Sequence, residues 1–520
     1  MLKNKETNYL NFSVFEKIGL LLVFVCFYWI QKEHINLDFW NDEIYTLKNF
    51  VFVPITTTLL DYHVPNNHIF FNLINNIYLK IIGVENLFDL MDHPYLIRLL
   101  PFLYSYITLL YVYFFGKKFF HFTVGFLSVI ILLSSISFFN FGLQLRGYSF
   151  SMMLLMMLIY YAFDYLEEKK KRNIALMIIL SCLSFYTVPV NLYPILGVIL
   201  FFFARGLFFK YKKSKTKSLE YLKISAYIFA GLFIGFILYL PMFRQVFFNE
   251  YVLSKKLFNP EVFQILLPDV WKFFLGKKLV INILVVLGIL SAFFKKNSFF
   301  KKDANILLWS FFLAPFLISF VRGEFIPDRA LSMLLPVFSL LVAVGIYSAI
   351  QLIPKSEKLS FFLVIPIGIY CFFIFDRDVK RVDAWLSHAL QISHRAQNLE
   401  NNYYLSYFRP LNDIQYFVEN HYTGSEKIVV YDCEPHGFYN YMDKYKVEYI
   451  IPRDMDEYLK TKPEKKVYMV ARFPNEFRNH ISQIHPYYKV EQLRPDFSYN
   501  NFFRLTLKTI EENLQKKSSN

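Results

Sequence analysis

The chain has 520 residues, of which 55% are hydrophobic and 20% aromatic, and its mean hydropathy is +0.33. The apolar residues exceed what a soluble core needs and come in long blocks separated by short basic loops, so the composition indicates a membrane protein with many spans. The net charge of +15 does not indicate a nucleic-acid partner, because lysine and arginine gather mainly beside the apolar blocks, as the positive-inside bias requires.

About eleven membrane spans are expected, near 18–36, 95–115, 123–140, 147–163, 174–188, 192–209, 221–241, 279–294, 304–321, 330–351 and 359–376. The first resembles a signal sequence, but no small-residue cleavage site follows it, so we expect a retained signal anchor in the cytoplasmic (inner) membrane. The basic clusters between spans then fall on the side of the N-terminus. The positive-inside rule makes that side the cytoplasm.

The stretch at 66–82 is apolar enough to be mistaken for a further span. It carries several asparagines, and counting it as a span would move every later basic cluster outside. We therefore predict an amphipathic helix that lies in the outer interface. Its apolar side would carry Ile69, Leu73, Ile77 and Ile81. The whole first loop, 37–94, is then expected to face outward.

The composition changes after the last span, so we expect a membrane domain over 1–376 and a second domain over 377–520. Beyond a helix-prone connector, β-rich runs alternate with helical ones, which is typical of a small α/β domain. Strands are predicted at 427–431, 447–451, 466–470, 487–492 and 502–507, and helices near 411–420, 435–442, 454–460 and 474–482. An odd number of spans makes this C-terminal domain extracytoplasmic.

Acids, histidines and asparagines crowd into the first loop between Leu37 and Phe71, which indicates a site at the membrane surface. Asp42 and Glu43 follow an aromatic pair that favours headgroup depth, where a lipid-borne substrate would present its head. The alternative is a solvated helix start, because Asn41 or Asp42 is a good N-cap and acids favour the first turn of a helix.

A second polar group in this loop comprises Asp61, His63, Asn67 and His68. The two histidines could bind a metal ion, but they are five residues apart across Pro65, which is not the spacing of a helical ligand pair. The four cysteines of the chain lie far apart, without metal-ligand or redox spacing. Polar contacts to a sugar, or capping of the helix that follows, fit this group better.

Two arginines stand at outer ends of predicted spans. Arg146 lies in a very short turn between two spans, and Asp328-Arg329 precedes the tenth span. A charge so close to hydrocarbon is costly unless it is paired, which makes it a functional candidate. Outward arginines beside a group of acids would suit an anionic lipid phosphate, because the guanidinium fork matches phosphate oxygens. The alternative is a snorkelling or structural arginine paired with an acid of the first loop.

These motifs resemble those of the membrane-embedded GT-C class glycosyltransferases, in particular the bacterial branch related to protein O-mannosyltransferases and the lipid A aminoarabinose transferase. The resembling motifs are Asn41–Leu47, Pro65–Phe71, Ile97–Pro101, Leu143–Ser149, Phe185–Thr187, Asp328–Arg329 and Leu335–Pro336. They come in the family's order along the membrane domain. The resemblance implies a GT-C-like fold, whereas the C-terminal domain matches only as a generic outward domain.

The resemblance also implies a reaction: inverting transfer of a hexose or pentose from a polyprenyl-phosphate carrier to a hydroxyl of a glycan, lipid or protein on the outer face. Asp42 would be the general base and Glu43 would orient it or the sugar, while Arg146 and Arg329 would stabilise the departing lipid phosphate. The other residues implied in substrate binding are Asp61, His63, Asn67, His68, Tyr148, Tyr186 and Asp328. Some relatives use a divalent cation and others none, so a metal cofactor stays open.

Two other classes of function remain. A transporter or flippase of lipid-linked sugars would also need many spans, but it should carry charges within its helices on both sides of the midplane, and the span interiors here are nearly free of charge. A non-catalytic membrane scaffold would not need the acid-rich first loop. The sequence names neither the sugar nor the acceptor.

Overall fold

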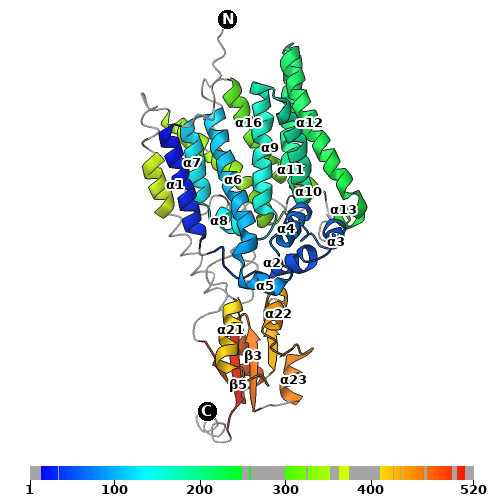
Figure 1. Ribbon diagram of the computed structural model, residues 1–520, viewed down its shortest axis with the longest axis vertical. Coiled ribbons are helices and arrows are strands. Elements are labelled where there is room, and N and C mark those ends of the chain that lie inside the picture. The colour runs from blue at the N-terminus through cyan, green and yellow to red at the C-terminus, as the bar shows by residue number, and fades with distance from the viewer. Residues whose placement is uncertain are drawn as a thin grey trace. The chain divides into compact units, whose positions relative to one another are not determined.

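The structure is a computed structural model, and it describes residues 13–248 apart from 33, 299–351 apart from 324–325, 364–373, and 410–509 apart from 426, 434, 462–464 and 495–499, with the single positions 257, 258, 260, 274 and 362. The chain divides into two units (Figure 1). The membrane unit comprises Met1–Lys32, Val53–Ile81 and Ile97–Arg377, and the second unit comprises Glu33–Phe52, Ile82–Leu96 and Asp378–Asn520.

The membrane unit is helical. Among its described residues, seven helices are long and apolar enough to cross a membrane, and a bent pair could provide an eighth. The seven are α1 (Val14–Gln31), α6 (Tyr95–Phe119), α9 (Tyr148–Glu168), α11 (Leu192–Tyr211), α12 (Lys215–Tyr239), α16 (Phe299–Arg322) and α17 (Leu335–Ile350). Shorter elements are α3 (Ile55–Leu60), α4 (Ile69–Ile81), α10 (Lys171–Thr187), η2 (Pro189–Asn191), η3 (Leu240–Met242), α13 (Phe243–Phe247) and η4 (Asp328–Leu334). The chain is therefore a multi-pass membrane protein.

The predicted count of about eleven spans is not confirmed. The predicted span at 279–294 lies outside the described residues, and the one at 359–376 is represented by a short apolar helix, Val364–Phe373. Where the sequence predicts a span at 174–188, α10 has 17 residues, and its buried side carries Asn173, Ser181 and Ser184. The helix packs between α9 and α12, which Figure 1 shows running alongside it.

The predicted span at 123–140 is not one straight helix: it is divided into α7 (Phe122–Leu133) and α8 (Ile136–Leu143), with a bend of 74° between them, and this pair is the possible eighth span. Two serines explain the break. Ser134 Oγ donates to the carbonyl of Ile130 at 2.7 Å, and Ser135 is the N-cap of α8, its side chain accepting from the Phe138 N–H at 3.3 Å. Serine hydroxyls compete for backbone partners in this way and so end one helix and begin the next.

The predicted helix at 66–82 is confirmed as α4. Its asparagines face the protein: Asn72, Asn75 and Asn76 are buried, and Asn76 donates to the carbonyl of Val53 at 2.8 Å. Of the predicted apolar side, Ile77 and Ile81 are 42% and 77% exposed, whereas Ile69 at the start of the helix is fully buried, so only the C-terminal half of that side faces away from the protein. A helix with its amide side inward and its aliphatic side outward suits a position against lipid rather than water.

The second unit contains a five-stranded sheet in the order β2-β1-β3-β5-β4. Its strands are β1 (Ile428–Asp432), β2 (Tyr449–Ile450), β3 (Lys466–Ala471), β4 (Tyr488–Gln492) and β5 (Asn501–Leu507), and its C-terminal helices are α21 (Pro410–His421), α22 (Pro435–Lys444), α23 (Met455–Thr461) and α24 (Pro474–Ile484). β1 runs parallel to β2 and β3, and β5 runs antiparallel to β3 and β4. The core beneath α24 is built from side chains such as Met469, Phe477 and Phe503. The predicted strands and helices of this region are confirmed, although β2 keeps only two residues of its predicted five.

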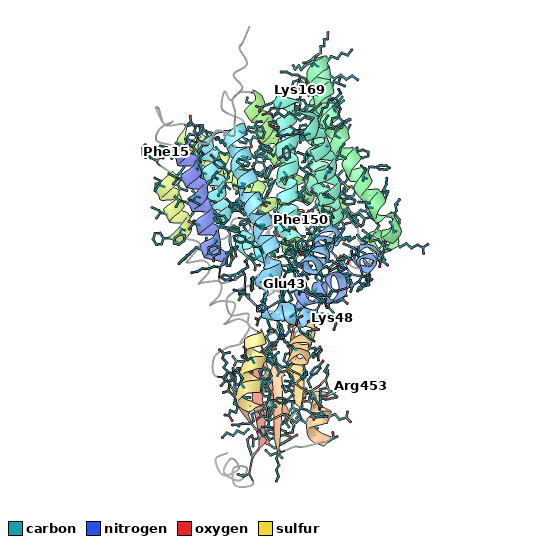
Figure 2. The ribbon with its side chains drawn as sticks, in the orientation of Figure 1. Phe15, Glu43, Lys48, Phe150, Lys169 and Arg453 are labelled. Carbon is teal, nitrogen blue, oxygen red and sulfur yellow. The ribbon has the colours of Figure 1, made fainter. Side chains whose placement is uncertain are left out.

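The second unit also includes two segments of the first loop. They form α2 (Asn41–Thr46), a π-helical turn η1 (Leu47–Val51) and α5 (Leu87–Asp92). Glu43 of α2 and Lys48 of the π-helical turn are labelled in Figure 2. α2 packs against α22. The acid-bearing turn of the first loop and the C-terminal sheet thus belong to the same contact unit.

The expectation that the first loop faces outward leads to a labelling prediction. Cysteines introduced at Asn49, which is half-buried, and at Asn86, the exposed N-cap of α5, should both react with a membrane-impermeant thiol reagent added from outside. The physical reason is that only this arrangement keeps the later basic loops in the cytoplasm. The measurement is gel-shift labelling of intact cells, with the parent chain as the background.

The matched control is a cysteine at Lys212, an exposed residue of a basic loop, which should react only after the cells are permeabilised. Labelling of only one of the two loop positions in intact cells would contradict the prediction, because the segment between them would then cross the membrane.

Candidate functional site

The first group of candidate residues is the acid pair in α2. The helix begins after Trp40, and the Glu43 carboxylate turns back to accept the Trp40 N–H at 2.9 Å. Glu43 is fully buried, whereas Asp42 is only partly buried. In the alternative of a solvated helix start, Asn41 or Asp42 would be the N-cap, but Trp40 holds that position, and its N–H donates to the Glu43 carboxylate. Asp42 is therefore the more accessible carboxylate of the pair.

The second group is the turn that leads into α4. Asp61 and His63 form a pair, with His63 Nδ1 2.6 Å from Asp61 Oδ1, and both side chains are substantially exposed. Asn67 is buried and is used within the loop: its amide donates to the carbonyls of Thr58 at 3.0 Å and Asp61 at 2.7 Å. The Asn67 side-chain oxygen accepts from Asn72 of α4 at 2.9 Å. These bonds fix the turn, and they leave the side chains of Asp61 and His63 accessible at the surface of the protein.

His68 joins this turn to the short connection between α8 and α9. The N–H of Gly147 donates to His68 Nδ1 at 2.7 Å, so the ring proton lies on Nε2. The Tyr148 ring lies edge-on to the His68 ring at 5.3 Å, and the Arg146 guanidinium lies 5.8 Å from the centre of the Tyr148 ring. A Cβ at Gly147 would lie only 3.0 Å from His68 Nδ1, a tight contact that favours glycine at this position.

The buried histidine and the arginines interact electrostatically. Burial lowers the pKa of His68 well below its usual value, and the positive charges of Arg146 and Arg329 lower it further. Burial raises the pKa of Tyr62, and the charge of Arg146 opposes that rise. His68 is therefore a neutral acceptor and Tyr62 a neutral phenol. Arg146 and Arg329 thus both lie within electrostatic range of the same imidazole.

The sequence did not single out the tyrosines behind this group. Tyr239 is fully buried at the end of α12, and its hydroxyl contacts the carbonyls of Phe185 at 3.0 Å and Tyr186 at 3.2 Å. Its ring lies 6.4 Å from that of Tyr62, and the backbone N–H of Tyr62 donates to Gln245 Oε1 at 2.6 Å. No sequence spacing relates these residues, so no pattern could have found them.

The membrane unit thus brings together His68, Arg146, Tyr148 and Arg329, with Tyr62 beside them. Tyr186, in the last turn of α10, connects to them through Tyr239. The side chain of Asp328 lies outside the described residues. The second unit holds Asp42 and Glu43.

The described residues contain no group of three or more histidine, cysteine, aspartate or glutamate side chains that could hold a metal ion. The Asp61–His63 pair supplies two potential ligands, one fewer than the three protein ligands of a typical catalytic zinc site.

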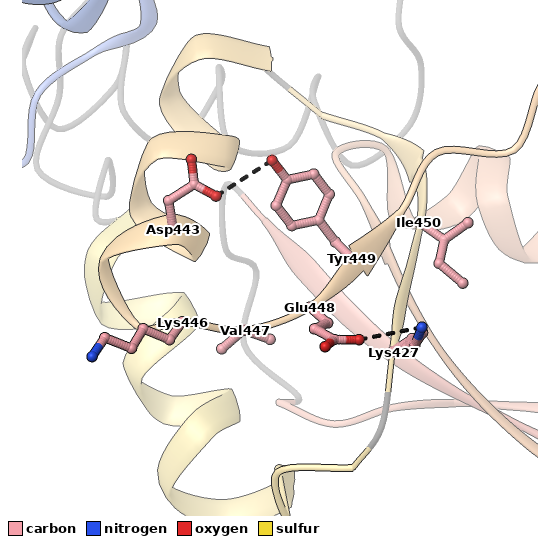
Figure 3. A pocket seen from close by; sticks show the side chains of 7 residues that line it. All are labelled: Lys427, Asp443, Lys446, Val447, Glu448, Tyr449 and Ile450. Atoms are coloured by element: carbon pink, nitrogen blue, oxygen red, sulfur yellow. Dashed lines mark hydrogen bonds and ion pairs between the residues drawn. The ribbon is translucent and has the colours of Figure 1, made fainter.

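Figure 3 shows a depression at the edge of the C-terminal sheet. Its lining consists of Lys427, Asp443, Lys446, Val447, Glu448, Tyr449 and Ile450. Lys427 pairs with Glu448 at 3.3 Å, and the Tyr449 hydroxyl donates to Asp443 at 3.4 Å. Four of its polar side chains are thereby engaged with one another, and no candidate site residue lines it.

No protein-family model matches the chain, and no curated protein matches it in sequence. Solved structures match its fold over nearly the whole length, and the fold is that of the GT-C membrane glycosyltransferases, as the motifs predicted. The particular similarity is to ArnT from Cupriavidus metallidurans. The crystal structure bound to undecaprenyl phosphate has a TM-score of 0.50 and 10% identity, and the apo structure has 0.51 and 11%. Each match covers 94% of this chain and 97% of that chain.

A weaker similarity, with a TM-score of 0.46 and 10% identity, extends to an oligosaccharyltransferase from Archaeoglobus fulgidus in complex with zinc and sulfate. This match covers 93% of this chain and 72% of that chain.

Proposed function

We propose that the protein is a glycosyltransferase that moves a sugar from a polyprenyl-phosphate carrier to an acceptor hydroxyl on the outer face of the inner membrane. The observation that carries the proposal is the ArnT-like fold, which extends over 94% of the chain. One of the matching ArnT structures is bound to undecaprenyl phosphate. A donor that arrives in the lipid phase needs no nucleotide-binding domain.

The arginine group supports the choice of an anionic donor. Arg146 is 3% exposed, and its charge and that of Arg329 act on the same neutral histidine. A cation held away from water stabilises charge that develops on a leaving group more strongly than a solvated one does. In the proposed reaction the two guanidinium groups stabilise the lipid phosphate as it departs. Tyr148, which lies beside Arg146, would contact the same end of the donor.

The acid pair supplies the base. The Asp42 carboxylate takes the proton of the acceptor hydroxyl, whose oxygen attacks the anomeric carbon while the bond from that carbon to the phosphate oxygen breaks. Attack opposite the leaving phosphate inverts the configuration. Asp42 suits this task because it is partly exposed, whereas Glu43 is buried and engaged with the Trp40 N–H. Glu43 then orients the turn that carries the base.

The remaining polar residues would contact the sugar. The exposed Asp61–His63 pair offers a carboxylate and an imidazole that could bind sugar hydroxyls, and Tyr186 offers a phenol. Asn67 would act indirectly, since its hydrogen bonds fix the turn that carries this pair. The acceptor can be a glycan, a lipid or a protein, and each would present a hydroxyl to Asp42.

The proposal is tested in a strain that lacks the protein. We expect mass spectrometry to find one sugar missing from an envelope glycan, and to find the matching polyprenyl-phosphate sugar accumulated in the outer leaflet. The purified protein in lipid nanodiscs should then transfer that sugar to the incomplete acceptor. Accumulation in the inner leaflet, with no transfer by the purified protein, would overturn the proposal in favour of a flippase. Unchanged glycans and carriers would overturn it in favour of a scaffold.

A further inference from the structure

The turn that carries Asp42 is attached to helix α22 of the C-terminal region. The side-chain oxygen of Asn41 accepts the N–H groups of His436 at 2.9 Å and Gly437 at 3.1 Å, in the first turn of α22. The first N–H groups of a helix have no partner within it, and an asparagine oxygen is among the best groups to satisfy them. Asn41 therefore caps a helix that follows it by 395 residues.

A second attachment lies just before the acids. Tyr441 is fully buried, and its hydroxyl accepts the backbone N–H of Phe39 at 2.7 Å and approaches the carbonyl of the same residue at 3.4 Å. A phenol that accepts a backbone N–H in a buried position is costly to remove, because the N–H would be left without a partner. The backbone three residues before Asp42 is thus fixed by one side chain of α22.

The same helix also lies beside the base. The His436 ring lies edge-on to Tyr45 with ring centres 4.7 Å apart, and Lys48 Nζ lies 3.4 Å from Asn440 Oδ1. Burial and the charge of Lys48 lower the pKa of His436, whereas the negative charge of Asp42 raises it. The Asp42 carboxylate is therefore within electrostatic range of α22. α22 also contacts α5, since Lys444 at the end of α22 pairs with Asp92 at the end of α5 at 2.6 Å.

We propose that α22 positions the catalytic base, with Asn41 and Tyr441 as the positioning residues. The inference rests on the proposed function, in which Asp42 takes the proton of the acceptor. Bonds at Phe39 and Asn41 hold the backbone on which Asp42 stands, so the carboxylate keeps one place and direction. A misplacement of a catalytic group by about 1 Å can lower the rate roughly 100-fold, so these bonds should affect the rate of transfer directly. The C-terminal region is then part of the active site.

The test compares two disruptive variants with two matched ones in the full-length protein. Asn41→Ala removes the cap and Tyr441→Phe removes the hydroxyl, and each should lower kcat by about 10- to 100-fold with little change in the KM for the lipid-linked donor. Asn41→Ser keeps a capping oxygen and should recover most of the rate. Tyr449→Phe removes a hydroxyl that contacts Asp443 of α22, away from the first loop, and should keep the parent rate.

Amide hydrogen exchange supplies a readout that does not depend on transfer. Exchange over residues 38–46 should be faster in Asn41→Ala and Tyr441→Phe than in the parent, and unchanged in Tyr449→Phe. Unchanged exchange in both disruptive variants would contradict the claim that Asn41 and Tyr441 hold the backbone of this turn. Faster exchange with parent kcat in both, while Asp42→Asn is inactive, would overturn the positioning role and leave the proposed function standing. An active Asp42→Asn variant would instead contradict the assignment of Asp42 as the base, and with it the proposal that α22 positions a catalytic base.

Discussion

Asp42→Asn is expected to lower the rate of sugar transfer by about two to four orders of magnitude, with little change in the apparent affinity for the donor. Asparagine has nearly the same shape as aspartate, so α2 and its contacts with α22 should persist while the proton acceptor is lost. The measurement is transfer by purified protein in lipid nanodiscs, with binding of the lipid-linked donor measured separately.

The matched control is Asp89→Asn, the same substitution at an exposed position in the first turn of α5, which should leave transfer unchanged. Glu43→Gln should be milder than Asp42→Asn, because glutamine retains an oxygen that can accept the Trp40 N–H. Near-normal turnover in Asp42→Asn would refute the assignment. Loss of transfer in Glu43→Gln alone would move the role of base to Glu43.

Arg146→Lys is expected to slow transfer although the charge is kept. A lysine cannot form the bidentate pair that a guanidinium makes with a phosphate. One hydrogen bond to a charged group contributes about 1.5 to 3 kcal/mol. Its loss should therefore lower kcat/KM by about 10- to 160-fold. The measurement is steady-state transfer with varied donor, and Arg329→Lys is expected to change kcat/KM in the same direction.

Arg205→Lys provides the control for this change. Arg205 pairs with the buried carboxylate of Asp303 at 2.7 Å, in a region that the charge pattern places toward the cytoplasm. The substitution there should leave transfer unchanged, provided that the variant inserts and folds. An Arg146→Lys variant with the parent rate would return Arg146 to a structural role beside His68 and Tyr148.

The C-terminal elements could be predicted because their signals are local. Strands β1, β3 and β5 come from short β-branched and aromatic runs, and the helices between them begin at residues such as Pro435 and Pro474, which favour a first turn. α4 could be predicted for a similar reason, since its isoleucines recur at helical spacing. The spacing places Ile77 and Ile81 correctly on the outer side of α4, but not Ile69, which is buried.

The features that the sequence did not predict depend on partners far away in the chain, or on side-chain hydrogen bonds that compete locally with the backbone. Under the alternative of a solvated helix start, Asn41 or Asp42 would cap its own helix, and nothing near Asn41 in sequence reveals that its side chain caps α22 instead. The break between α7 and α8 follows from two serine hydroxyls that a hydropathy average does not register. For the candidate site, the motifs indicated His68, Arg146 and Arg329 individually. Tyr62 and Tyr239 carry no motif, because only the packing of α12 brings them together.

The bond between Asn41 and α22 also sets an order of events during synthesis. The ribosome makes His436 395 residues after Asn41. At about 5 to 20 residues per second, these two residues emerge roughly 20 to 80 s apart. Throughout that interval the early membrane helices can insert, but the turn that carries Asp42 has not yet met the helix that holds it. With the positioning role proposed above, a nascent chain would be inserted before it is active, and transfer would begin only once its C-terminal region has folded.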